Sequence, residues 1–449
     1  MYKTSIKLTA LSLVSALVLS LTACGSNTQS SSAQVSGSVG PTSAPAETVK
    51  LKVMFHYTSE DEKATWNYAM EKMKALMPNV SLDIDPTPQD SDAKLKTEFA
   101  SGSLPDIFDL GLSNIPLGVK SNSLLPLDDY VTKYKITDKL TPTGEALLKQ
   151  QNGHTWSILA ANTNFAVIYA NKALFDQAGA KIPENYDQLL EAGKLLKAKG
   201  IVPMGIWLKE AWPAIQLYDM ISITENSKGV TALDQNGTET TTSKAYLDAA
   251  QKIHDMAKAG IISKDASTTD YNSAVAQFES GKSAMFLCGN WMAQEFGEKL
   301  GDKATILLPN IFADASLAQT VKSSGVMSGG GFTGGFAVSA NSAHKDIAAE
   351  YAVQAALYAI EGRIVKTGEQ NTMLKSAPAP EKAANALQTQ LSGMISNVKA
   401  STTMGWSFDS AKINTDLYSK LSSLYTGQYQ PEDFANDTAK LIEADRAAE

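Results

Sequence analysis

Residues 49–55 read VKLKVMF, so apolar and charged side chains alternate as they do along a half-buried β-strand. The next segment, 60–77, predicts a helix, because its apolar positions recur at helical spacing. A second strand is expected at 80–85, a helix at 93–100 and a short third strand at 105–110. Strands and helices that alternate in this order predict a doubly wound α/β sheet with parallel strands.

The loops that follow the first and third strands are the first candidate binding loops. In doubly wound sheets, ligands bind beyond the carboxyl ends of the strands, which here points to 56–58 and 110–114. Tyr57 and Thr58 follow the first strand, and Asp109 ends the third. We predict these three residues as ligand contacts, with helix capping at a strand end as the alternative for each.

The same alternation continues along the chain, which at 449 residues is long enough for two domains. Further strands are expected at 156–160, 165–169, 201–207, 284–288 and 336–339, and further helices at 172–178, 186–199, 244–259 and 345–360. The polar stretch 225–243 lacks this periodicity, so we expect it to be a surface loop.

The composition is that of an ordinary globular protein, with 43% hydrophobic and 19% charged residues. It excludes a disordered, a collagenous and a multi-span membrane protein. The 39 Lys and Arg residues are scattered among 47 Asp and Glu residues, which gives a net charge of −8. A chain without a basic stripe has nothing to hold the phosphates of a nucleic acid, so we expect no nucleic-acid partner.

The N-terminus predicts export. Lys3 and Lys7 precede an apolar run at 8–21, which is too short for a typical membrane-spanning helix, and small residues lead to Cys24. This pattern resembles a bacterial lipobox, so residues 1–23 are expected to be a lipoprotein signal peptide. By that resemblance Cys24 carries a diacylglycerol thioether, whose two chains attach the protein stably to a membrane. A plain signal peptide with an accidental cysteine is the alternative.

Residues 24–47 are expected to form a flexible tether behind the lipidated cysteine, because they are rich in Ser, Gly, Thr and Pro and have no apolar cluster. The chain has two cysteines, Cys24 and Cys288. With Cys24 used as the lipid site, no disulfide is expected. Cys288 ends the apolar run 284–288, which predicts a core residue rather than a reactive thiol.

Motifs of enzymes are absent or incomplete. A GxGxxG string occurs at 329–334, but the nucleotide fingerprint needs a helix after it, whereas a strand is expected here. Gly-Lys-Ser at 281–283 follows a helix and lacks the earlier glycine of a phosphate-binding loop. The histidines are too widely spaced for a metal site: His56, His154, His254 and His344. We therefore predict no catalytic residue, no metal and no cofactor.

Several segments carry a family resemblance: 99–108, 169–175, 278–291 and the strand at 336–339 with the helix after it. Together they resemble the extracellular solute-binding proteins (family 1) of carbohydrate ABC importers, the group that includes maltose-binding protein. The likeness spans nearly the whole chain behind the lipobox. One departure is Gly-His-Thr-Trp at 153–156, where the family usually shows Gly-Lys-x-Tyr.

The resemblance implies a type II periplasmic-binding-protein fold: two doubly wound α/β lobes, a hinge, and a ligand in the cleft between the lobes. It implies a first lobe of 48–163 with 336–370 and a second lobe of 164–335 with 371–449. Binding by hinge closure, without turnover, is the activity that follows.

Flat aromatic rings suit the apolar face of a sugar, so the tryptophans are the first candidate contacts. Trp291 follows a strand and a Gly-Asn turn, and it matches the family position that stacks on sugar. Trp406 falls where the family presents a second aromatic, and Trp212 starts a helix at a cleft edge. Packing is the alternative for these three. It is the expected role of the others: Trp66, Trp156 and Trp207.

Three further residues complete the predicted site. Asn164 matches a family position that bonds sugar hydroxyls, and Asn162 lies beside it in the expected crossing between lobes. Ordinary turn chemistry is the alternative for both amides. Phe332, within the glycine run, is expected to close over the ligand, although a flexible turn explains the glycines equally well.

The sequence thus predicts a lipoprotein, anchored to the outer face of the bacterial cell membrane, that captures a sugar or oligosaccharide. The resemblance implies that the protein passes this ligand to the transmembrane subunits of an ABC permease. We expect the protein to be a monomer. A binder of a non-sugar solute is the first alternative. An exported carbohydrate-active enzyme or adhesin that uses the same export signals is the second. A glycosidase would need two acids placed across a cleft.

Overall fold

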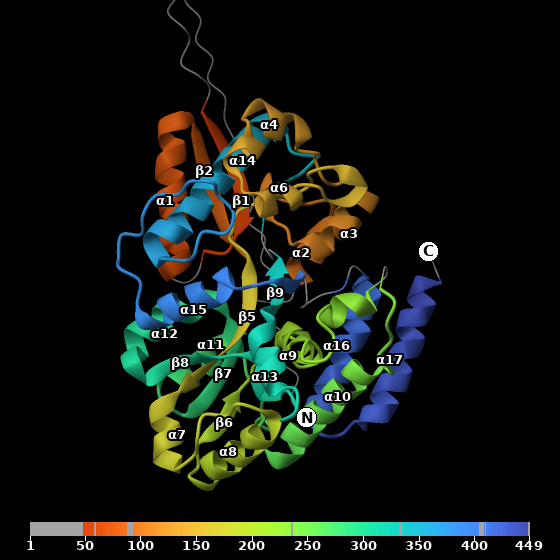
Figure 1. The fold of residues 1–449 in the computed structure, drawn as a ribbon. Helices are drawn as coiled ribbons and strands as arrows, with labels where there is room; N and C mark the ends of the chain where they lie inside the picture. The colour runs from red at the N-terminus through yellow and green to blue at the C-terminus, as the bar shows by residue number, and fades with distance from the viewer. Residues whose placement is uncertain are drawn as a thin grey trace, which may run out of the picture. The chain divides into compact units, whose positions relative to one another are not determined.

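The computed structural model describes residues 48–57, 60–87, 93–234, 237–331, 335–403, 408 and 410–447. The predicted signal peptide, the tether and Cys24 lie outside these residues. Within the described part, helices surround two β-sheets (Figure 1). None of the helices described there combines the length and the apolar character that crossing a membrane requires.

The first sheet has the strand order β2-β1-β3-β10-β4. Its strands are β1 (Val49–Phe55), β2 (Val80–Pro86), β3 (Ile107–Asp109), β4 (Ile158–Leu159) and β10 (Gly335–Val338). β1 pairs in parallel with β2 and β3, as predicted, but β10 runs antiparallel to both β3 and β4. The sheet is therefore mixed, because β10 enters from a distant part of the chain rather than through a crossover helix.

The helices around the first sheet are α1 (Glu60–Leu76), α2 (Ala93–Ser101), α3 (Ile115–Lys120), α4 (Asp128–Lys133), α5 (Ile136–Lys139), α6 (Pro142–Ala146) and α14 (Lys345–Gly362), which a π-helix (Arg363–Thr367) extends. The predicted α1, α2 and α14 are confirmed to within two residues at each end. α1 and α14 lie side by side against the sheet (Figure 1).

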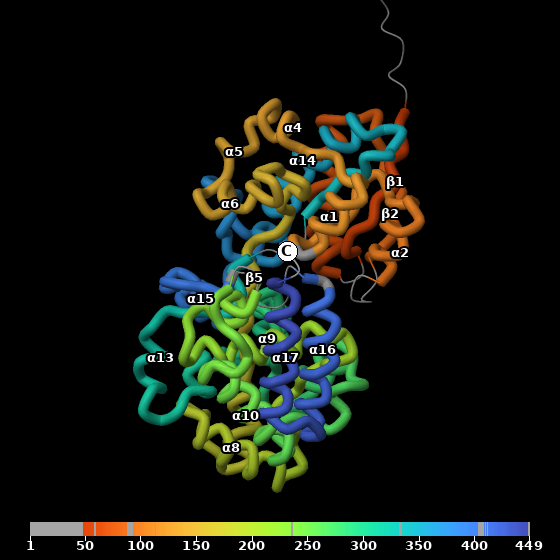
Figure 2. The backbone as a smooth tube through the Cα atoms, turned by 90° about the vertical axis from the view of Figure 1, so that its right-hand side faces the viewer, coloured from red at the N-terminus to blue at the C-terminus, as the bar shows by residue number. Residues whose placement is uncertain are grey.

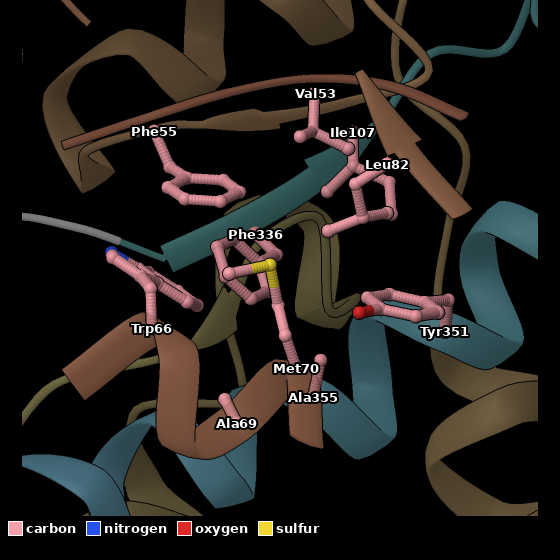
Figure 3. A pocket seen from close by; sticks show the side chains of 10 residues that line it. All are labelled: Val53, Phe55, Trp66, Ala69, Met70, Leu82, Ile107, Phe336, Tyr351 and Ala355. Atoms are coloured by element: carbon pink, nitrogen blue, oxygen red, sulfur yellow. The ribbon is translucent and has the colours of Figure 1, made fainter. Parts of the chain in front are cut away.

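Aromatic rings fill the space between these two helices and the sheet (Figure 3). Trp66 of α1 lies between Phe55 of β1 and Phe336 of β10, with ring centroids 4.3 and 4.9 Å away. The cavity left among these side chains is only about 10 Å³ and its lining is apolar. A cavity of that size and character is close to the minimum for one water, so the space is dry core. Trp66 packs, as predicted.

The second sheet has the strand order β11-β9-β5-β7-β6, with β8 paired to β5. Its strands are β5 (Asn164–Asn171), β6 (Val202–Gly205), β7 (Ser283–Gly289), β8 (Ala304–Leu307), β9 (Val326–Gly331) and β11 (Ala400–Thr403). β5 is antiparallel to β7, β8 and β9, and β6 is parallel to β7. The glycine run thus contains a strand, β9, and a second strand, β10, follows it, which excludes the nucleotide fingerprint.

The helices around the second sheet are α7 (Lys172–Ala178), α8 (Tyr186–Ala198), α9 (Trp212–Ser222), α10 (Lys244–Ala259), α11 (Tyr271–Glu279), α12 (Ala293–Leu300), α13 (Ala318–Ser324), α15 (Ala386–Ser396), α16 (Ala411–Tyr425) and α17 (Pro431–Arg446). α7 and α10 have the predicted bounds. α10, α16 and α17 pack together (Figure 2). Cys288 of β7 is fully buried, as predicted, and burial raises the pKa of its thiol to about 12.

The expectation that 225–243 is a surface loop is wrong for its central part. A 3-10 helix (Gly229–Leu233) buries Val230 and Leu233 in the core beside α9. Its apolar residues lie among polar neighbours in sequence, yet they are buried in the fold. Gly229 has a positive φ of 49°, and a Cβ there would lie 2.0 Å from an oxygen of Asp219, so this turn needs glycine.

The chain passes from one sheet to the other at three places. The first crossing segment is 160–163, between β4 and β5. The second is 332–334, between β9 and β10, and it lies outside the described residues. The third crossing segment is 368–385, between the π-helix and α15. Three segments therefore join the two sheets. A rotation of one sheet relative to the other must change the backbone in all three of them.

The aromatic core of the first sheet gives a stability prediction. Replacement Phe336→Ala should lower the free energy of unfolding by about 3–5 kcal/mol, because it removes a ring that touches Trp66 and leaves a cavity. Leu76→Ala, on a half-exposed side chain at the end of α1, should change it by less than about 0.5 kcal/mol. Urea denaturation of both variants measures the difference, and equal losses would contradict the packing role.

Candidate functional site

Four aromatic side chains gather near the carboxyl ends of β6 and β7, and we call them the aromatic cluster: Trp207, Trp212, Tyr271 and Trp291. The Trp207 ring centroid lies 4.7 Å from those of Trp212 and Tyr271, and Trp212 lies 6.3 Å from Trp291. Trp207 is buried, so it packs as predicted, whereas Trp212 and Trp291 are half-buried. Two indoles of the cluster thus keep part of their surface open.

Trp291 is held firmly. It lies in a 3-10 helix (Asn290–Met292) directly after β7, and its Nε1 donates a hydrogen bond of 3.2 Å to the Tyr271 hydroxyl. The Tyr271 hydroxyl in turn lies 2.9 Å from the Met292 sulfur. A Cβ on Gly289 would lie 1.9 Å from the indole, so the ring can pack against the backbone there only because residue 289 is glycine.

Trp212 is presented by a strained turn. Ala211 adopts φ 63° and ψ −47°, a conformation that costs an alanine of order 1–3 kcal/mol, and α9 begins at the next residue. Strain of this kind persists only where the surrounding structure enforces it and is common at binding sites. The prediction that Trp212 starts a helix is confirmed.

Glu210 is a candidate contact that sequence reasoning missed. Its side chain is buried beside the aromatic cluster, and its Oε1 accepts a hydrogen bond of 3.4 Å from the Tyr271 amide. Burial raises the pKa of its carboxyl. A carboxylate next to two indoles can accept hydroxyl hydrogens while the rings cover an apolar face. The available signal was an acid two residues before the tryptophan that begins a helix.

A buried carboxylate on α9 joins the strands that lead to two predicted contacts. Asp219 is fully buried, and its Oδ2 accepts from the Ser328 hydroxyl at 2.5 Å and the Thr402 hydroxyl at 2.8 Å. Its Oδ1 accepts from the Val230 amide at 2.8 Å. Ser328 lies on β9 and Thr402 on β11, so one side chain fixes both strands to α9.

The two strands run toward predicted contacts that the structure does not describe. β9 leads to Phe332 and β11 leads to Trp406, and both residues lie outside the described part of the chain. Their roles therefore stay predictions. Thr58, predicted beyond β1, also lies outside the described residues.

At the carboxyl ends of β1 and β3, the structure brings His56 and Asp109 together. The His56 Nε2 and an Asp109 oxygen are 3.5 Å apart, and both side chains are partly exposed. Sequence reasoning placed Asp109 at this strand end but did not pair it with His56. Tyr57 turns to a different partner, because its hydroxyl donates a 2.8 Å hydrogen bond to Asn67 of α1.

The two predicted asparagines lie where the chain crosses between the sheets. Asn162 is fully buried, and its Oδ1 accepts hydrogen bonds from the Thr372 amide and hydroxyl at 3.1 and 3.4 Å. Its oxygen therefore links the first and third crossing segments. Asn164 begins β5, opposite Gly331 of β9, and is half-buried. A ligand role for either amide stays a prediction.

The described residues contain no group of three or more His, Cys, Asp or Glu side chains placed to hold a metal ion. The charged and polar groups named above offer hydrogen bonding beside aromatic faces. That chemistry suits a neutral ligand with many hydroxyl groups.

The sequence pattern of the family described as "Bacterial extracellular solute-binding protein" matches residues 57–354. Among curated relatives, an uncharacterized ABC transporter extracellular-binding protein of Pyrococcus horikoshii is 24% identical over 308 residues, 65% of this chain and 66% of that protein. A multiple sugar-binding protein of Streptococcus mutans is 22% identical over 54% of this chain and 58% of that protein. The matches thus span between about half and two thirds of these relatives.

Solved structures share the fold. A chitin oligosaccharide binding protein aligns with a TM-score of 0.74 at 22% identity, over 89% of this chain and 99% of its own. A sugar transporter protein from Arthrobacter chlorophenolicus, with bound laminaribiose, aligns with a TM-score of 0.67 at 15% identity, over 88% of this chain and 99% of its own. At these identities the likeness concerns the fold alone.

The close packing of Trp291 on Gly289 gives a second prediction. Gly289→Ala should displace the indole and lower the free energy of unfolding by about 1–3 kcal/mol, because the added methyl group overlaps the ring. Near-ultraviolet circular dichroism and urea denaturation measure the two effects. Gly393→Ala, on an exposed helical position with open space around it, is the matched control and should leave both unchanged or slightly raise stability.

Asp219 gives a prediction about pH. Burial raises the pKa of its carboxyl to about 6, although the hydrogen bonds from Ser328, Val230 and Thr402 oppose that shift. The unfolded value is about 3.9, so folding favours the protonated form. This contribution to stability is present in full below about pH 4 and is lost as the pH rises through about 6.

The free energy of unfolding of the Asp219→Asn variant should lack this dependence. The wild-type value minus the variant value is expected to fall by on the order of 3 kcal/mol between pH 4 and pH 7. Urea denaturation across that range measures it. Parallel profiles for the two proteins would show that Asp219 does not titrate there.

Proposed function

Because the chain belongs to the bacterial extracellular solute-binding protein family, we propose that it captures a sugar or oligosaccharide outside the cell and delivers it to an ABC permease. The fold is the two-lobed α/β architecture of type II periplasmic sugar-binding proteins, as predicted. Curated relatives are described as sugar-binding proteins, which supports the carbohydrate assignment.

The observation that carries the proposal is the aromatic cluster. Trp212 and Trp291 keep part of their rings open at the carboxyl ends of parallel strands, and a buried carboxylate, Glu210, lies beside them. A pyranose offers an apolar face of C–H groups and an edge of hydroxyls. Indole faces cover the first and a carboxylate accepts from the second, so one sugar ring satisfies both kinds of group.

The remaining predicted contacts belong to the same proposal. His56 with Asp109 would supply polar groups from the first lobe, and Tyr57 lies beside them. From the crossing, Asn164 would bond a hydroxyl, whereas Asn162 has a structural partner in Thr372. The predicted contacts outside the described residues remain part of the proposed site: Thr58, Phe332 and Trp406.

We retain the predicted lobes, 48–163 with 336–370 and 164–335 with 371–449, as part of the proposal. Two observations support them. The hydrophobic clusters of the first sheet draw only on residues up to 160 and from 336 to 377, so this core also takes in Met373, Leu374 and Ala377, which the predicted bound at 370 gives to the second lobe. Those of the second sheet draw only on residues from 165 to 327 and beyond 386. Separate cores joined by a few crossing segments are the architecture that hinge closure needs.

Turnover of the ligand is not part of the proposal. Relatives and structural neighbours are solute-binding receptors, and the polar groups of the aromatic cluster are arranged for hydrogen bonding. The remaining predictions also stand as proposals: a monomer, held by a lipid on Cys24 at the outer face of the membrane, that docks on permease transmembrane subunits. A non-sugar solute is the alternative ligand.

A thermal-shift screen of residues 47–449, which form one compact unit, tests the proposal. The panel holds mono- and oligosaccharides, polyols and amino acids, and product formation is followed in parallel. A ligand that binds only the folded protein raises the midpoint, so a saturable rise with one saccharide class and no product is expected. A rise only with amino acids, or consumption of the sugar, would overturn the assignment.

Once a saccharide is identified, Trp291→Ala should weaken its binding by about 2 kcal/mol or more, roughly 30-fold in Kd, because the stacking face is lost. Trp156→Ala is the matched control, since this indole packs beside the core of the first sheet and should leave affinity unchanged. Isothermal titration calorimetry measures both. An unchanged Kd for Trp291→Ala would remove Trp291 from the site.

A further inference from the structure

We propose that Asn290 is a positioning residue that locks the Trp291 loop to the first crossing and thereby sets the hinge equilibrium of the protein. The inference rests on the proposed function only for the ligand, because the coupling itself is a property of the free protein. Asn290 is the residue directly before Trp291, and nothing in its sequence context marks it as more than part of a turn.

Both ends of the Asn290 side-chain amide are hydrogen-bonded. Its Nδ2 donates to the Thr163 carbonyl at 3.0 Å, and its Oδ1 accepts from the Phe165 amide at 2.9 Å. The two partners flank Asn164, the residue at which the first crossing becomes β5. We call these two hydrogen bonds of Asn290, to Thr163 and Phe165, the bracket. The side chain is 5% exposed, which means that water cannot replace either bond if the bracket is lost.

A further hydrogen bond attaches β5 to Gly289, the last residue of β7 before this loop. The Tyr169 hydroxyl donates to the Gly289 carbonyl at 2.9 Å. Gly289 and Asn290 together therefore fix the backbone that carries Trp291 at two points on one buried strand. The backbone that leads into Trp291 cannot move relative to β5 unless one of these bonds breaks.

The bracket continues into the third crossing segment. The Thr163 amide and hydroxyl both donate to the Thr372 hydroxyl at 3.1 Å, and the Thr372 amide donates to Asn162. A chain of hydrogen bonds thus runs from the Trp291 loop through Thr163 to Thr372. A rotation at either crossing must move or strain the bonds of Asn290.

This arrangement has a mechanical consequence. A ligand shifts an open–closed equilibrium only by the difference in its affinity for the two states. If the Trp291 ring could move with the ligand, the ligand would bind the open and the closed state with similar affinity. Little of the binding free energy would then favour closure. With the ring locked to the crossing, stacking demands one orientation of the hinge.

The test compares Asn290→Ala with a matched control, Asn310→Ala, in residues 47–449. Asn310 is also buried and donates one side-chain bond to a backbone carbonyl, that of Glu184, at 2.7 Å, but it lies away from the crossings. Dyes on Lys74→Cys of α1 and Lys194→Cys of α8, both exposed, report the distance between lobes. Cys288 is buried and does not compete for the label.

Without ligand, Asn290→Ala should broaden the distribution of energy-transfer efficiencies, whereas Asn310→Ala should match the wild type. With the saccharide from the screen, Asn290→Ala should need at least 10-fold more ligand to reach the closed state. A wild-type distribution together with wild-type closure in Asn290→Ala would overturn the inference.

Asn290→Asp separates positioning from simple loss of stability. At pH 8 its carboxylate faces the Thr163 carbonyl and should behave as the alanine variant does. Burial and the facing carbonyl both favour the protonated form of this acid. At pH 5 the protonated acid can donate to that carbonyl while its other oxygen accepts from Phe165, so closure should return toward the wild type at the same pH. The other titratable groups near the loop, and Asp219 behind β9, are present in both proteins and cancel in this ratio. Those near the loop are Tyr169, Cys288, Tyr271, Glu295 and Glu210.

The experiment distinguishes a failure of the proposed function from a failure of the role proposed for Asn290. If the wild type binds no saccharide, the proposed function fails, and the ligand-free distributions still decide the role of Asn290. If the wild type binds and closes but Asn290→Asp shows no recovery at pH 5, the positioning role fails and the proposed function stands. Should Asn290→Ala not fold, the aspartate variant at pH 5 and pH 8 gives the same comparison.

Discussion

Strand β5 is buried along seven of its eight residues, and this constraint governs the second sheet and the site. A backbone so far from water must pair nearly all its polar groups. β5 meets this demand with β7 along one edge, and with β9 and then β8 along the other. Because β5 begins where the chain leaves the first sheet, the pairing that buries it also fixes the crossing and, through Asn290, the loop of Trp291.

Several features of the site are unfavourable for folding by themselves, and interactions in the surrounding structure compensate for them. Ala211 holds an unfavourable backbone conformation, and Glu210 and Asp219 bury carboxyl groups whose pKa values burial raises. None of these features improves stability on its own. Each instead fixes something that touches the proposed ligand or leads to it: the ring of Trp212, an acceptor beside it, and the strands β9 and β11. Such costs are expected where binding geometry matters more than stability.

Sequence periodicity predicted the elements whose pattern is local. The alternation of β1, the helical spacing of α1 and α10, and the placement of Trp291 after β7 all follow from neighbouring residues. The antiparallel entry of β10 was missed, because strand direction depends on the path of the chain. Asp219 and Asn290 were missed for the same reason, since both partners of Asn290 and the Ser328 and Thr402 partners of Asp219 lie more than 100 residues away in sequence. Glu210 was next to a chosen residue, yet only burial distinguishes it from other acids.

The distribution of fixed and movable parts determines where binding energy goes. In the described part of the aromatic cluster, Trp291 is held by Tyr271 and Gly289, and Trp212 by the turn at Ala211, so a ligand has few side chains to order there. Ordering costs of that kind normally consume part of the interaction energy. Here the fold has already ordered these side chains. The conformational freedom that remains lies in the crossing segments, which join two separate hydrophobic cores. A ligand that stacks on these fixed rings and also contacts the first lobe therefore gains most affinity when the lobes close. Part of its binding free energy then drives closure.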